Sequence, residues 1–335
     1  MSKQDQDIAY MSAHDGGFGD PSDAIEHVLA RVENPDPSVT ETWWWCFYIP
    51  ERNINGEVYF WKHSNLGTMS GGVWVFQGIK SHHLQCEHFN WLSFIPGPEA
   101  TEKSLHSPHL NLRINVIEPL QRHEVLYSHA PTGTSLRLLA ESVQPPVLRA
   151  NNAHFEQVQR MTGELQLGGE TLAINCFSFR DRSWGEPRPE VSVVHPPTAW
   201  GVGVSRDGRR SFCFSACDDP DRNPLVASYG IKPNEALKIG WIQDGSDLRR
   251  LTALSKLTTR GPDRLQAQSL DISFADERGK SYRLVGNITA SVMWSPWPNM
   301  AATFGQHCEW ELDGEPMSGE VQEVFWGDCI GRMLR

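Results

Sequence analysis

Short runs of β-branched and aromatic residues, separated by turn sequences, recur along almost the whole chain of 335 residues. In the first part of the chain these runs occupy residues 42–49, 57–63, 72–77, 84–94, 110–117 and 123–128. Turn signals rich in glycine and proline, such as Ser70-Gly71-Gly72 and Pro96-Gly97-Pro98, lie between them. Regularly spaced strands of this length predict an all-β fold built from antiparallel barrels or sandwiches.

A second series of such runs predicts a second domain. It occupies residues 161–167, 171–179, 199–204, 211–215, 237–243, 267–274, 281–290 and 307–312. Because Pro145-Pro146 separates the two series, we expect two tandem β domains, residues 1–146 and 147–335, as the chain length also suggests. Helical periodicity is scarce, and one short helix is expected over residues 21–32, before Asn34-Pro35.

Charge and hydropathy exclude several classes of partner. The net charge of −11 and the lack of a lysine and arginine block argue against nucleic acid, whose phosphates would be repelled. No apolar run reaches the length of a membrane span, and the N-terminus lacks the apolar core of a secretory signal. These features predict a cytoplasmic protein, and they leave open whether it forms a homodimer.

Tryptophan is unusually abundant, with thirteen residues. Large flat side chains suit a barrel interior or an apolar ligand pocket, although ordinary core packing is the alternative for each one. The residues that we expect to contact an apolar ligand are Tyr48, Trp61, Trp74, His88, Trp91 and Trp184.

The segment with the strongest chemical signal is Arg-Asp-Arg-Ser-Trp-Gly at residues 180–185, which continues an apolar strand. A hairpin about Gly168-Gly169 would bring His154 or Glu156 close to Asp181. Carboxyl groups beside a histidine and Arg180 form a candidate acid–base set, because crowding and nearby cations can drive their pKa values apart. The alternative is a buried ion-pair network that fastens the hairpin to its neighbour.

Three motifs resemble one superfamily. These are His-Phe-Glu-Gln at 154–157, Thr-Gly-Glu-Leu at 162–165 and the segment 180–185, supported by the aromatic strands at 43–48 and 72–77. Together they resemble the AttH-like superfamily of paired lipocalin-like domains, which includes the carotenoid 1,2-hydratases, and in particular its uncharacterised bacterial catabolic branch. The resemblance implies two β-barrels side by side, no metal or organic cofactor, and hydration, dehydration, cyclisation or rearrangement of hydrophobic substrates.

One position departs from the superfamily. Many relatives carry histidine where this chain has Arg182. If that histidine shuttles a proton in the relatives, this chain must use another group, such as His154, or perform different chemistry. The motif could also act as a structural staple, since it occurs in relatives of unlike function.

The function that these observations favour is a cofactor-independent lyase acting on a bulky, apolar, oxygenated molecule such as a terpenoid, steroid or lignin-derived aromatic. Asp181 would exchange the proton, His154 or Glu156 would be its partner, and Arg180 would tune it electrostatically. The alternatives are a carrier that binds such a ligand unchanged, and an isomerase or cyclase on the same class of substrate. A pure carrier has no need of a perturbed carboxylate, so the charged cluster slightly favours an enzyme.

A metal site is not expected. His82, Cys86 and His88 have the residue types of zinc ligands and would share one face of a strand. Neither their spacing nor a second ligand pair supports a zinc site, so we expect a polar patch instead.

Overall fold

The computed structural model describes residues 17–27, 34–149, 153–185, 187, 194–295, 300–327 and 329–335. Contacts between residues divide the chain into two units. The first unit contains residues 17–187 and the second contains residues 194–335.

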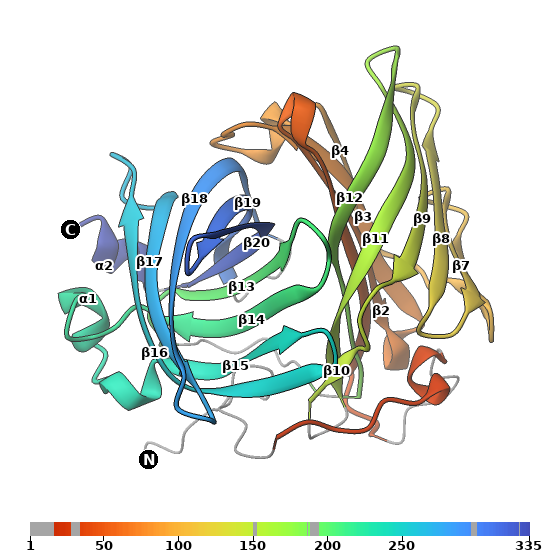
Figure 1. The fold of residues 1–335 in the computed structure, drawn as a ribbon. Helices are drawn as coiled ribbons and strands as arrows, with labels where there is room; N and C mark the ends of the chain where they lie inside the picture. Colours follow the sequence, from red (N-terminus) through yellow and green to blue (C-terminus); the bar gives the residue numbers. More distant parts are fainter. Residues whose placement is uncertain are drawn as a thin grey trace. The chain divides into compact units, whose positions relative to one another are not determined.

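The first unit is built around one 12-stranded antiparallel sheet that curls strongly (Figure 1). Its strands are β1 (Thr40–Ile49), β2 (Ile54–His63), β3 (Thr68–Gln77), β4 (His88–Pro96), β5 (Glu99–Thr101), β6 (Ser104–Ser107), β7 (Leu112–Glu118), β8 (Arg122–His129), β9 (Thr134–Ser142), β10 (Val147–Leu148), β11 (His154–Leu167) and β12 (Glu170–Ser183). Their order is β4-β3-β2-β1-β12-β11-β9-β8-β7-β6-β5, and β10 pairs with β11. The last long strand, β12, therefore lies beside the first, β1.

Alternation along the strands gives the first sheet two faces. On β1, Trp43, Trp45 and Phe47 belong to a large apolar cluster that also contains residues of β2, β3, β7, β8, β9, β11 and β12. We call this the core face. Successive side chains of a strand point to opposite sides, so Trp44 lies on the other face of β1.

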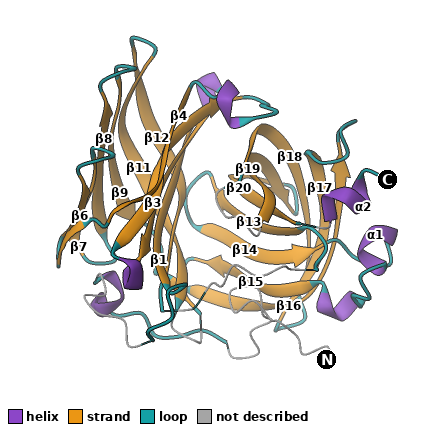
Figure 2. Ribbon diagram, turned by 180° about the vertical axis from the view of Figure 1, so that it is seen from behind, coloured by secondary structure: helices purple, strands orange, loops and turns teal. Residues whose placement is uncertain are grey.

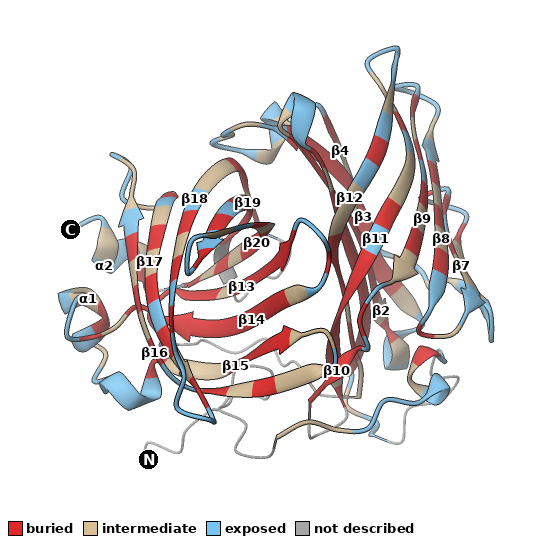
Figure 3. Ribbon diagram, viewed as in Figure 1, coloured by how far each residue is buried: buried red, intermediate tan, exposed pale blue. Residues whose placement is uncertain are grey.

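The second unit is a closed antiparallel barrel. Its eight strands are β13 (Thr198–Ser205), β14 (Arg210–Cys217), β15 (Leu237–Asp244), β16 (Asp247–Arg260), β17 (Ala267–Asp276), β18 (Ser281–Trp294), β19 (Met300–Leu312) and β20 (Glu315–Trp326). Strands β13 and β14 are buried along most of their length, as their red colour in Figure 3 shows. The barrel is filled by an apolar cluster that includes Phe212, Phe214 and Trp310.

Charged side chains are also buried in the second unit. The ammonium group of Lys256 on β16 bonds to Asp218 Oδ1 and lies 2.8 Å from Thr258 Oγ1. Burial opposes ionisation of Asp218, but the charge of Lys256 outweighs it and lowers the pKa of Asp218 to about 2. Lys256 is therefore the counter-charge that keeps this carboxylate ionised inside the barrel.

Helices are few and short among the described residues (Figure 2). They are α1 (Pro224–Ala227) and α2 (Cys329–Met333), with 3₁₀ turns η2 (Asp23–Glu26), η3 (Pro50–Arg52), η4 (Ser64–Leu66), η5 (His83–Gln85) and η6 (Pro233–Glu235). The helix expected over residues 21–32 is a single 3₁₀ turn within its described part, and residues 28–32 lie outside the described residues. No helix in the described ranges is long and apolar enough to cross a membrane.

The all-β fold predicted from the sequence is confirmed, but the expected domain boundary at Pro145-Pro146 needs correction. Strands β11 and β12 follow these prolines, yet β12 pairs with β1 and β11 pairs with β9 in the first sheet. The two units divide after Pro187 instead. Because strand pairing across the sheet is not encoded locally, the prolines mark only a connection within the first unit.

Candidate active site

The hairpin of β11 and β12 holds the residues that the sequence singles out. Gly168 and Gly169 at its turn have φ angles of 59° and 84°, which glycine adopts without strain. From this turn the register runs without interruption from Leu167 opposite Glu170 to His154 opposite Ser183. It places Glu156 directly across from Asp181, as the sequence analysis expects.

A row of side chains continues from this pair across six adjacent strands, β11, β12, β1, β2, β3 and β4. Asp181 pairs with Trp44, and Trp44 pairs with Tyr59. Tyr59 in turn lies opposite Gly72, and Gly72 lies opposite Trp91. We call the face that carries this row the Asp181 face.

Glu156 is the most tightly held member of the row. Its Oε1 accepts hydrogen bonds from Arg149 Nη2 and His154 Nε2, each over 2.9 Å. Burial alone would raise the pKa of this carboxyl, but the charges of His154 and Arg149 outweigh burial and hold the pKa well below its usual range. Glu156 is therefore a fixed negative charge beside Asp181, which is itself partly exposed.

Aromatic rings occupy the other end of the row. The rings of Tyr59 and Trp91 stack with centroids 6.0 Å apart, across the position where Gly72 has no side chain. The indole of Trp74 lies edge-on to Trp91, also at 6.0 Å. Trp44 is buried between the carboxyl groups and the rings, and its Nε1 donates to Glu57 Oε2 over 2.9 Å. The Asp181 face thus joins acid–base groups to a cluster of largely buried aromatic rings.

The expected ligand-contacting residues do not all lie on this face. Trp61, Trp74 and Trp91 lie on the Asp181 face. Tyr48 lies farther along β1, and its backbone N–H donates to Cys176 Sγ over 3.3 Å. His88 instead belongs to the core face, because it pairs with Val75 of the core cluster. Trp184 follows β12 and packs against Phe155, with ring centroids 6.2 Å apart.

Arg180 is not the electrostatic neighbour of Asp181 that the sequence analysis expects. Adjacent residues of a strand point to opposite faces, and Arg180 lies on the core face opposite Trp45 and Gln157. Its guanidinium donates to Glu26 Oε1 over 2.6 Å and to Gln157 Oε1 over 2.8 Å. It contributes to the interior of the first unit, on the face opposite to Asp181.

Arg182, at the position where relatives carry histidine, also lies on the core face. Its guanidinium lies between the rings of Trp43 and Trp184, 4.8 Å and 5.0 Å from their centroids. It donates to Glu41 Oε2 over 3.1 Å and to the carbonyl of His27 over 2.7 Å. Burial lowers the pKa of Arg182 to about 10, which still leaves it charged at neutral pH. This residue therefore cannot replace a histidine in proton transfer near pH 7.

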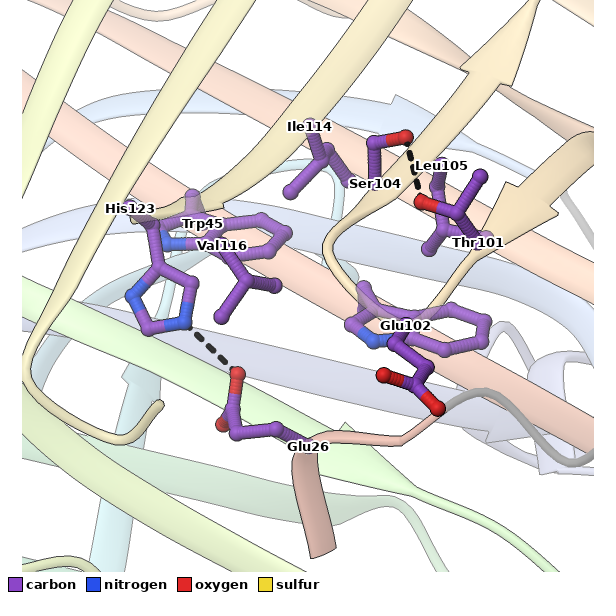
Figure 4. A pocket seen from close by; sticks show the side chains of 10 residues that line it. Glu26, Trp45, Thr101, Glu102, Ser104, Leu105, Ile114, Val116 and His123 are labelled. Carbon is purple, nitrogen blue, oxygen red and sulfur yellow. Dashed lines mark hydrogen bonds and ion pairs between the residues drawn. The ribbon is translucent and has the colours of Figure 1, made fainter. Parts of the chain in front are cut away.

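The partners of these two arginines are not evident from the sequence. Glu26, Glu41 and His123 are each buried and complete an ionic cluster on the core face. His123 Nε2 lies 2.6 Å from Glu26 Oε2, as the dashed line in Figure 4 shows. Two arginines that continue an alternating apolar run signal that buried carboxylates lie nearby, but the sequence does not say which ones.

A small cavity adjoins this ionic cluster (Figure 4). Its volume is about 10 Å³, which is room for roughly one water molecule. The lining consists of Glu26, Trp43, Trp45, Thr101, Glu102, Ser104, Leu105, Ile114, Val116 and His123.

The three possible zinc ligands do not come together. His82 Nδ1 accepts a hydrogen bond from the backbone of Leu84, and His88 Nε2 lies 2.7 Å from the Tyr127 hydroxyl. Burial, followed by the nearby charge of Glu87, raises the pKa of Cys86 to about 12. Within the described ranges, no three histidine, cysteine, aspartate or glutamate side chains are arranged to hold a metal ion.

The imidazole of His88 should stay neutral well into the acid range. Burial, with a smaller effect of nearby His129, lowers its pKa to about 4. A histidine in the unfolded chain takes up its proton near pH 6.5, so stability should be lost as the pH falls from about 6.5 to about 4. In urea titrations at stepped pH, the free energy of unfolding should fall more steeply over this window for the wild type than for His88→Gln. Equal slopes would contradict the assignment.

The chain belongs to the family described as domain of unknown function DUF7064, whose model matches residues 20–324. No curated protein matches the chain significantly.

Three solved structures share the fold. A candidate AttH protein from Nitrosomonas europaea has a TM-score of 0.60 and 12% identity, with 90% of this chain and 99% of that chain covered. Kievitone hydratase from Nectria haematococca has a TM-score of 0.56 and 13% identity, and CghA has 0.55 and 12%. Both of these cover 95% of this chain and 98% of their own. At such identities the similarity defines the fold alone.

Proposed function

We propose that this protein is a cofactor-independent lyase of the hydratase or dehydratase type. The observation that carries the proposal is the row on the Asp181 face, in which Glu156 and Asp181 lead through Trp44 to the stacked rings of Tyr59 and Trp91. Acid–base groups beside a cluster of aromatic rings suit a bulky, apolar, oxygenated substrate such as a terpenoid, steroid or lignin-derived aromatic. The name of the neighbour kievitone hydratase is in keeping with this reaction type.

The proton exchange is assigned to Asp181. Glu156 is already held by hydrogen bonds from Arg149 and His154, which makes Asp181 the better candidate for giving and taking a proton. In the dehydration direction, the Asp181 carboxyl donates its proton to the substrate hydroxyl, the C–O bond breaks and water leaves. The carboxylate then removes a proton from the adjacent carbon, so that an alkene forms and Asp181 regains its proton. Hydration is the reverse.

The neighbours of Asp181 favour this step. Positive charge develops on the substrate carbon as the C–O bond breaks, and the fixed negative charge of Glu156 stabilises it electrostatically. The faces of Trp44 and Tyr59 add a cation–π attraction. His154 bonds to Glu156 and helps to fix the position of that carboxylate.

The experiment that tests the function is turnover in ¹⁸O-labelled water. The purified protein would be incubated with a panel of apolar alcohols and alkenes from the three substrate classes, and the products would be analysed by mass spectrometry. Gain or loss of one water, with ¹⁸O incorporated in the hydration direction, is the expected result. Saturable binding without any product would favour a carrier, and an unchanged mass with altered retention would favour an isomerase or cyclase.

A further inference from the structure

Residues 17–27 form a strap over the first unit, which we call the N-terminal strap. It is attached at one end by a β-bridge between Phe18 and Arg149 and a hydrogen bond from Gly19 N to Leu148 O over 2.8 Å. Ile25 packs against the small apolar cluster of Leu120, Leu148 and Phe155. The strap then inserts Glu26, with 3% of its surface exposed, into the core-face interior. A single 3₁₀ turn therefore delivers one carboxylate into the sheet's interior.

The groups that receive Glu26 belong to the sheet and form a complete carboxylate-binding site. Arg180 Nη2 contacts Oε1, and His123 Nε2 contacts Oε2, both over 2.6 Å. Gln157 orients Arg180 by accepting from its Nε over 2.8 Å, and Gln159 Nε2 lies 3.4 Å from His123 Nδ1. All four sheet residues are buried, and His123 also borders the cavity. The sheet thus presents a preorganised positive site to one carboxylate.

An apolar space adjoins this carboxylate. The walls of the cavity beside Glu26 include the indoles of Trp43 and Trp45 and the side chains of Leu105, Ile114 and Val116. In Figure 4, Trp45 and Val116 lie close to His123 and Glu26. The cavity holds roughly one water while Glu26 is in place. Withdrawal of the Glu26 side chain would enlarge this space and join it to the arginine site.

We propose that the core face of the first unit is a binding site for a small apolar carboxylate, such as an arylacetate, and that Glu26 occupies it as an internal substitute for the ligand. Binding then exchanges one carboxylate for another at Arg180 and His123, and the strap leaves with Glu26. The exchange keeps the buried guanidinium of Arg180 paired with a carboxylate. If the strap opened without a ligand, this guanidinium would lose its carboxylate partner. This proposal is independent of the chemistry on the Asp181 face.

Phenylacetate is a suitable probe, because it joins a carboxylate to an apolar ring. Glu26→Ala vacates the carboxylate position, so phenylacetate should raise the melting temperature of this variant, while the neutral phenylacetamide and chloride at equal ionic strength should not. Quenching of Trp43 and Trp45 fluorescence should report binding, with a Kd at least about tenfold lower in Glu26→Ala than in the wild type, where Glu26 competes.

Three further variants control the experiment. Glu102→Ala removes another carboxylate of the cavity wall and should leave the wild-type Kd unchanged. Combining Glu26→Ala with Arg180→Met should abolish the preference for phenylacetate over phenylacetamide. If Glu26→Ala does not fold, Glu26→Gln replaces it in the test. This variant keeps the side-chain volume without the charge, so its affinity for phenylacetate should lie between those expected for the wild type and Glu26→Ala. Equal phenylacetate affinities for the wild type and Glu26→Gln, or no preference for the charged probe in Glu26→Ala, would overturn the proposal.

Discussion

Replacing Asp181 with asparagine is expected to lower the rate of the proposed reaction by about a hundredfold or more, as for the loss of a general acid–base group. The substitution keeps the shape of the side chain and removes its ionisation. The melting temperature should change little, because Asp181 is partly exposed and the β11–β12 register is set by backbone pairing. Steady-state kinetics and thermal unfolding on the same preparation would measure both effects.

Glu164→Gln offers a matched control for this variant. Glu164 lies eight residues along β11 from Glu156, on the same face but exposed, and at about 26 Å it is too far to take part. Its loss should leave both the rate and the melting temperature unchanged. If Asp181→Asn instead melts markedly lower while the folded protein turns over normally, the motif at 180–185 is a structural staple and the proposed role of Asp181 is wrong.

Replacing Lys256 with methionine should destabilise the second unit by about 3–5 kcal/mol, the usual effect of removing one partner of a buried ion pair. The side chains of Lys256 and Asp218 are 1% and 3% exposed. In the variant, Asp218 would keep its hydrogen bonds from Thr258 and Asn223, each over 2.8 Å, but would lose its cation. Urea unfolding followed by circular dichroism would measure the loss.

The control for this prediction is Lys232→Met. Lys232 and Glu235 are 4.0 Å apart with 72% and 45% of their side chains exposed, so this ion pair should contribute less than about 1 kcal/mol. Similar losses for the two lysine variants would contradict the argument. Acid provides a second measurement, because the folded pKa of Asp218 is about 2 against an ordinary 3.8. Its stabilising effect should be present above pH 4 and lost as the pH falls toward 2 in the wild type.

Strands with alternating aromatic or β-branched residues could be predicted from the sequence, whereas strands built from helix-forming residues could not. The missed strand β9 (Thr134–Ser142) contains the run Leu-Arg-Leu-Leu-Ala-Glu, and β16 (Asp247–Arg260) contains four leucines, one lysine and three arginines. Their local preference does not favour a strand. Each becomes one because strands on both sides pair with it, which is a tertiary effect.

The candidate site shows the same limit. The contact between Glu156 and Asp181 follows from a hairpin whose turn is visible as Gly168-Gly169, so local sequence was sufficient. The expectation that Arg180 lies beside Asp181 is wrong, because adjacent side chains of a strand point to opposite faces. This alternation could have been applied to the sequence alone. Glu26 could not be predicted as the partner of Arg180, since the two residues are 154 positions apart.

The pairing of β1 with β12 also governs how the protein must be made. Thr42 and Ser183, whose hydroxyl oxygens lie 2.6 Å apart, are 141 residues apart in the chain. While a ribosome synthesises the intervening segment, which takes on the order of ten seconds, β1 has a partner on one edge only. The other edge of a strand with three consecutive tryptophans stays open to other nascent chains. A fragment that stops at residue 146 would keep this open edge permanently, and we expect it to aggregate where the full chain folds.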